Sequence, residues 1–155
     1  MNKILYYSAR LHCNVDLAFE MFTKNDYLQK WLTINADVEP KVGGKYELFW
    51  NPEDKESDST IGCKITALEL GKFLAFEWKG PKQYKVFMNT ADPLTHVVVF
   101  FIPCGATENS DAWTEVHLIH SGWRSSVEWE EARIWFGKAW DVAFKNLERH
   151  VNGSP

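Results

Sequence analysis

One histidine of the chain stands where it could do chemistry. His120 comes two residues before Gly122 and three before Trp123, at the expected end of the last strand. An imidazole at such a position can donate a hydrogen bond to a bound ligand, or transfer a proton near neutral pH. A histidine held by backbone or tryptophan partners in the core is the alternative interpretation. His117 falls on the opposite face of that strand and is expected to meet solvent.

Two other sites, a histidine–cysteine pair and an arginine, invite a chemical interpretation. His12 and Cys13 are adjacent, but neighbouring residues of a strand point to opposite faces, so we expect a buried, inert thiol rather than an activated one. Arg133 could bind a ligand carboxylate through two parallel hydrogen bonds. A solvated or salt-bridged arginine is the alternative.

Motifs for cofactors and metals are missing from the sequence. It has no Walker loop, dinucleotide fingerprint, nucleophile elbow or HExxH motif. Its cysteines are isolated, and no histidine pair has the spacing of a zinc site. We therefore expect neither a cofactor nor a metal, and the catalytic residues stay unknown.

The aromatic residues give the strongest indication of a binding site. The chain contains eight Trp, ten Phe and five Tyr. Large rings fill a core, and they also line apolar ligand cavities, so both interpretations remain open. The residues expected to line a cavity are Trp31, Trp50, Phe76, Trp78, His120, Trp123, Phe136 and Trp140.

A long C-terminal helix must position several of these rings. Residues 127–151 contain no proline and no strand-like alternation. At 1.5 Å per residue, such a helix spans ~37 Å, enough to cross a whole sheet. Ser126 is the expected N-cap, and Gly153 is expected to end the helix. The apolar residues that recur every three or four positions are Trp129, Ala132, Phe136, Trp140, Ala143, Leu147 and Val151.

The rest of the chain predicts two short helices near the start and an antiparallel sheet. Asn14 is expected to cap the first helix, and Asn25 or Asp26 the second. Residues 80–92 predict an irregular, partly apolar loop, and residues 104–112 a turn. The strands expected from alternation and from β-branched and aromatic content are 4–12, 34–38, 46–50, 61–70, 73–79, 96–102 and 113–121.

Composition restricts the class of protein. The length of 155 residues suits a single domain covering 1–155. A net charge of −4 with scattered Lys and Arg argues against nucleic-acid binding. No apolar stretch approaches the ~20 residues of a membrane helix, so no membrane insertion is expected. Three distant cysteines indicate reduced thiols, and we expect a cytoplasmic location.

Four stretches, taken in order, resemble the SRPBCC or START-like superfamily of lipid-transfer START domains, birch-pollen allergens and polyketide cyclases. The closer resemblance is to the AHSA-type subfamily, named after the activator of the ninety-kilodalton heat-shock protein ATPase, and covers roughly residues 4–151. It implies an α+β helix-grip fold: two short N-terminal helices and a curved antiparallel sheet wrapped around the long C-terminal helix, with a cavity between them. The stretches are 15–19 with Lys30-Trp31, 42–46, 62–78, and 114–123 followed by Trp140, Phe144 and Leu147.

Three functions are compatible with this resemblance. The first is a small-molecule-binding module with an apolar cavity for a lipid-like or aromatic ligand. The second is a cyclase-, aromatase- or hydrolase-like enzyme that uses His120 or Arg133. The third is an interaction module that contacts a chaperone or forms a homodimer. A cavity above ~300 Å³ favours the first two. A filled core with an exposed apolar patch favours the third.

Overall fold

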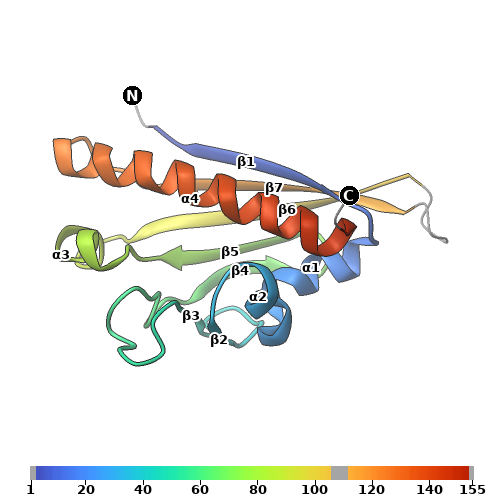
Figure 1. Ribbon diagram of the computed structural model, residues 1–155, viewed down its shortest axis with the longest axis horizontal. Helices are drawn as coiled ribbons and strands as arrows, with labels where there is room; N and C mark the ends of the chain where they lie inside the picture. The colour runs from blue at the N-terminus through green and yellow to red at the C-terminus, as the bar shows by residue number, and fades with distance from the viewer. Residues whose placement is uncertain (1–2, 106–111, 154–155) are drawn as a thin grey trace.

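The computed structural model describes residues 3–105 and 112–153. Two layers make up the fold: an antiparallel sheet, and helix α4 (Val127–Asn152) running lengthwise across it (Figure 1). The predicted α+β helix-grip fold with a curved sheet is confirmed. The expected turn at 104–112 lies mostly outside the described residues. The sheet strands, in spatial order, are β1 (Leu5–Leu11), β7 (Trp113–Ser121), β6 (Thr95–Cys104), β5 (Phe73–Trp78) and β4 (Ile65–Glu69).

Strand β7 shows how the sheet divides its two faces. Its buried residues alternate with half-buried ones, and the buried set is Thr114, Val116, Leu118 and His120. This is the face predicted from the sequence. The pairing Val97↔His120 in β6 continues the buried face, so β6 is the central strand that its β-branched residues predict.

Helix α4 begins and packs as its periodicity predicts. Ser126 caps it by accepting a hydrogen bond from the backbone N–H of Trp129 at 3.2 Å. Six of the seven predicted stripe residues are buried, and Val151 in the last turn is half-buried. Tyr7 of β1 donates a hydrogen bond to the carbonyl of Gly137, which fixes the middle of the helix to the edge strand.

The two short helices, α1 (Val15–Thr23) and α2 (Asn25–Trp31), are also present. Asn14 caps α1 as predicted, through its side-chain oxygen and the N–H of Leu17. The predicted cap of α2 by Asn25 or Asp26 is wrong, because Lys24 holds that position without a side-chain bond. The side chain of Asn25 instead accepts from the backbone N–H of Val38 at 2.9 Å, joining the helix to the next strand.

A second, smaller sheet of β2 (Asn35–Val38) and β3 (Tyr46–Phe49) stands beside the first. An isolated bridge between Lys45 and Lys64 connects the two sheets. The segment 80–92, predicted to be an irregular loop, contains two short helical segments. They are η1 (Lys82–Tyr84) and α3 (Lys85–Met88), and the mixed composition of the segment does not predict them. Within the described ranges, no helix is long and apolar enough to span a membrane.

Candidate functional site

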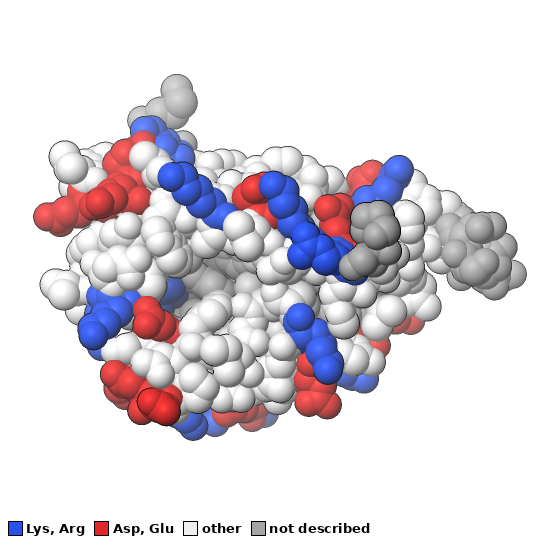
Figure 2. Space-filling model, viewed as in Figure 1, with Lys and Arg blue, Asp and Glu red and all other residues white. Residues whose placement is uncertain are grey.

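A pocket of about 620 Å³ opens between α4 and the segments that face it. It appears as a hollow near the centre of the molecular face in Figure 2. This volume exceeds the ~300 Å³ of a small ligand site. The pocket wall consists of Trp31 at the end of α2 with the following Leu32, Trp50 after β3, residues 58–59, residues 78–81 with Gln83, and the side of α4 from Trp135 to Asn146.

The structure separates the predicted cavity residues into two groups. Trp31, Trp50, Trp78, Phe136 and Trp140 line the pocket. Phe76, His120 and Trp123 do not belong to its wall. Phe76 lies behind the wall with its ring stacked on Tyr46, the centroids 3.8 Å apart, while Trp123 packs against His120 at 4.6 Å.

His120 is fully buried, and protein groups engage both of its ring nitrogens. Nε1 of Trp140 donates to Nδ1 at 3.0 Å, and Nε2 lies 3.0 Å from the hydroxyl oxygen of Thr95. An indole N–H can only donate, so Nδ1 is the acceptor and Nε2 carries the proton in the neutral ring. Burial lowers the pKa of His120 to about 3, so the ring is neutral at pH 7. The histidine therefore positions Trp140 and leaves no nitrogen for a ligand.

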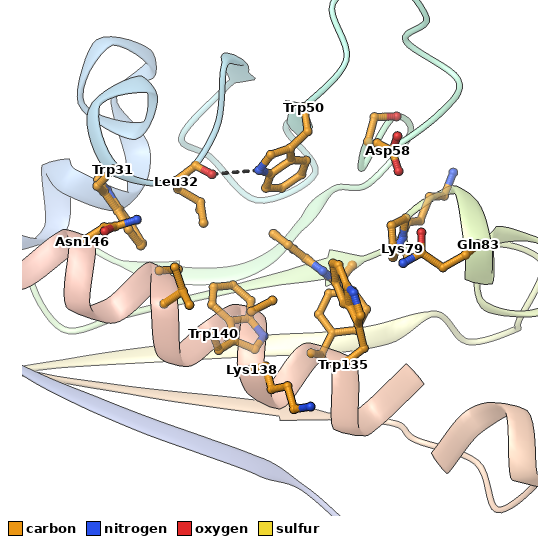
Figure 3. A pocket seen from close by; sticks show the side chains of 18 residues that line it. Trp31, Leu32, Trp50, Asp58, Lys79, Gln83, Trp135, Lys138, Trp140 and Asn146 are labelled. Carbon is orange, nitrogen blue, oxygen red and sulfur yellow. Dashed lines mark hydrogen bonds between the residues drawn. The ribbon is translucent and has the colours of Figure 1, made fainter. Parts of the chain in front are cut away.

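The indole nitrogens in the pocket wall differ in their partners. Nε1 of Trp31 donates to the carbonyl of Met21 at 2.8 Å, and Nε1 of Trp50 to the carbonyl of Leu32 at 2.9 Å (Figure 3). Nε1 of Trp78 is buried and finds no acceptor among the described residues. A buried donor without an acceptor is uncommon in folded proteins. Trp78 is thus the one pocket indole for which the structure shows a buried, unused donor.

Polar side chains gather at one end of the pocket. Asp58, Lys79 and Gln83 lie together there, and Trp31 and Asn146 lie at the opposite end (Figure 3). The carboxylate of Asp58 accepts the backbone N–H of Lys82 at 2.8 Å, and the ammonium of Lys79 donates to the carbonyl of Ile61. The ammonium retains two further donors. The pocket thus has an apolar body with a polar end.

Trp135, which was not among the residues predicted to line a cavity, belongs to the pocket wall and has 37% of its surface exposed. Its ring meets Tyr84 of η1 at 6.0 Å, so it spans the gap between α4 and that segment. The apolar stripe does not include it. The signal that could have found it is a second stripe on the same helix, formed by Trp135, Ala139, Val142 and Asn146.

The other candidate groups lie outside the pocket wall. Arg133 is held by Glu130, with Nε 3.2 Å from the carboxylate. Burial raises the pKa of Cys13 to about 11 and that of Cys63 to about 12, which keeps both thiols protonated and unreactive. In the part of the chain that the structure describes, no three His, Cys, Asp or Glu side chains are grouped to hold a metal.

Comparison with known proteins places the chain among relatives of one fold. The family described as Activator of Hsp90 ATPase homolog 1-like protein matches residues 12–152. No curated protein sequence is significantly similar to the chain.

Three solved structures illustrate the likeness, each at an identity that supports the fold alone. Protein MLL2253 from Mesorhizobium loti has a TM-score of 0.71 at 16% identity, with 99% of each chain covered. The Aha1 dimer from Colwellia psychrerythraea has a TM-score of 0.70 at 16% identity, with 96% of each chain covered. PFC0360w, an HSP90 activator from Plasmodium falciparum, has a TM-score of 0.70 at 21% identity, covering 98% of this chain and 97% of that one.

Proposed function

The chain belongs to the family of Activator of Hsp90 ATPase homolog 1-like proteins, and from that premise we propose that it binds a lipid-like or aromatic small molecule. The observation that carries the proposal is the open pocket of about 620 Å³ with aromatic walls. Sites for small molecules are concave and mostly apolar, with a few placed polar groups, and this pocket has the same composition.

The geometry supports binding better than acid–base catalysis by the histidine. His120 lies outside the pocket wall, and its neutral ring is satisfied by Trp140 and Thr95. A general acid or base must reach the substrate directly or through one water molecule. The second residue considered for catalysis, Arg133, also lies outside the wall.

Filling the pocket tests the proposal. N-phenyl-1-naphthylamine fluoresces when it enters an apolar site, so its titration measures affinity. Ala139→Trp introduces an indole into the pocket wall and should weaken binding at least about tenfold, since a filled site excludes the probe. Ile134→Trp is the matched control: Ile134 lies on the same helix, is 49% exposed and does not line the pocket. Equal affinity in wild type and both variants would contradict the proposal.

A second candidate function rests on the outer face of the sheet. Tyr6, Phe100 and Ile102 lie there and are 53%, 40% and 46% exposed. Exposed apolar side chains that share a face are typical of interaction sites. A chaperone is the partner that the family description suggests.

ATP hydrolysis by a ninety-kilodalton heat-shock protein distinguishes the two candidates. If the outer face binds the chaperone, adding this protein should change the hydrolysis rate, and Phe100→Asp should abolish that change. Ala139→Trp, on the opposite side of the sheet, should leave it intact. A rate that the protein does not alter would rule out this candidate.

A further inference from the structure

We propose that the pocket selects an amphipathic acid, whose apolar body lies against the indoles and whose carboxylate group lies near Lys79 or Lys138, the two lysines of the pocket wall. This inference rests on the proposed function and specifies the class of its ligand. It follows from the charges of the pocket wall, and the unused donor of Trp78 is compatible with it.

The charged side chains of the pocket wall are two lysines and one aspartate. Neither Lys79 nor Lys138 takes part in an ion pair among the described residues. Lys145, further along α4, is paired with Asp141 at 2.9 Å. Asp58 directs one carboxylate oxygen to the backbone N–H of Lys82. The wall is therefore net positive, although the whole chain carries a charge of −4.

The positions of these lysines suit a ligand with two unlike ends. Lys79 lies with Gln83 at the end of the pocket away from Trp31, and Lys138 extends from α4 beside Trp135 (Figure 3). An acid in the pocket would thus have two ammonium groups available, that of Lys79 at the polar end and that of Lys138 beside Trp135.

Trp78 supplies an independent observation. Its ring is 3% exposed and belongs to the pocket wall, and its Nε1 finds no acceptor in the described part of the protein. A buried donor is stabilised by an oxygen acceptor. Carboxylate oxygens accept hydrogen bonds and a protonated amine does not, so this donor disfavours an amine ligand. The preference for an acid over an alcohol rests on the two lysines.

A pair of near-isosteric competitors tests the charge. Naphthalene-2-carboxylate and naphthalene-2-carboxamide differ in charge, and each can displace N-phenyl-1-naphthylamine from the pocket. We expect the carboxylate to displace the probe at about one-tenth of the concentration that the amide requires, the size of one charge-assisted hydrogen bond. In the double variant Lys79→Gln, Lys138→Gln this preference should shrink to within about twofold.

The controls separate this inference from the function on which it rests. Lys41→Gln alters an exposed lysine outside the pocket wall and should keep the full preference. Unchanged probe affinity in the double variant would show that the pocket remains intact. Equal displacement by acid and amide in wild type, or a preference that survives in the double variant, would overturn the inference alone. Failure of Ala139→Trp to weaken probe binding would overturn the proposed function instead.

Discussion

Nε1 of Trp140 donates a hydrogen bond to Nδ1 of His120 at 3.0 Å, and this bond connects the pocket wall to the buried face of the sheet. The connection continues beyond the histidine. Thr95, which lies beside Nε2 of His120, directs its hydroxyl to the carbonyl of Trp78 at 3.5 Å. The rings of Trp78 and Trp140 also meet directly, with centroids 5.2 Å apart. Two pocket indoles on different elements therefore share one buried polar support.

Replacing each of these indoles by phenylalanine should have unequal effects. Trp140→Phe removes the donor and leaves Nδ1 of His120 buried without a partner, whereas Trp78→Phe removes a donor that is already unpaired. Both changes delete the same atoms, so their difference isolates the hydrogen bond. We expect Trp140→Phe to lower the free energy of unfolding by about 1–3 kcal/mol more than Trp78→Phe. Urea denaturation measures both, and an equal loss would show that the bond contributes nothing.

The pH dependence of stability should report the neutral state of His120. Its pKa falls from about 6.5 in the unfolded chain to about 3 in the fold, so only the unfolded chain takes up this proton between those values. The stability that the fold gains by keeping His120 neutral is fully present above pH 6.5. The free energy of unfolding then decreases progressively as the pH falls toward 3. At pH 4.5 the loss should reach roughly 2–3 kcal/mol.

A variant isolates this titration from the others. His120→Gln retains a donor and an acceptor but does not titrate, so its stability should fall less steeply between pH 7 and pH 4.5. The pKa of His96 is also lowered by burial, but it contributes to both proteins and cancels in the comparison. If the free energy of unfolding, measured by urea denaturation, changed equally with pH in the wild type and in His120→Gln, the lowered pKa of His120 would be contradicted.

Gly137 offers a test of how α4 packs on β1. An added Cβ would lie 3.4 Å from the hydroxyl oxygen of Tyr7 and 3.8 Å from Leu5, distances of ordinary contact. Because glycine inside a helix costs about 0.5–1 kcal/mol relative to alanine, Gly137→Ala should stabilise the protein by up to that amount. Gly44→Ala is the opposite control, since its Cβ would lie 2.3 Å from the carbonyl oxygen of Glu39. The midpoint temperature of thermal unfolding should rise in Gly137→Ala and fall in Gly44→Ala.

Two tryptophans of α4 should separate affinity from stability. Trp135 is 37% exposed and lines the pocket, so Trp135→Ala should weaken probe binding several-fold and cost less than about 2 kcal/mol of stability. Trp129 is 8% exposed and lies outside the pocket wall. Trp129→Ala should cost about 3–5 kcal/mol while leaving probe affinity unchanged. A reversed pattern would show that Trp135 supports the fold rather than the site.

The periodicity of apolar residues correctly predicted the elements that bury one side against the core. The stripe of α4 and the alternation of β7 follow directly from burial on one side, which is why both predictions are confirmed. The second short helix lacks such a signal at its start, since Asn25 serves a tertiary contact with Val38 instead of a cap. The helical segments within 80–92 were missed because each is much shorter than the window of about 11–18 residues over which helical periodicity can be recognised.

The candidate site was harder to predict. A strand pattern indicates which face of the sheet a side chain occupies, but not whether that side chain reaches the pocket or is covered by another residue. Phe76 and Trp78 share one strand face, yet Tyr46 covers Phe76 while Trp78 reaches the pocket wall. Trp140 likewise separates His120 from the pocket by lying over it. Residues 58–59 and 79–83 form the polar end and follow no periodic pattern, so only the three-dimensional structure brings them together.

The pairing of β1 has a consequence for how the protein is made. Leu5 pairs with His120, more than one hundred residues later in the chain, and the side chain of Asn152 bonds the backbone of both Arg10 and His12. During synthesis the first strand must therefore wait until nearly the whole domain has left the ribosome. Long-range pairing of this kind slows folding to milliseconds or seconds. Until α4 emerges, the nascent sheet keeps its apolar face uncovered, a condition in which incompletely folded chains are prone to aggregate.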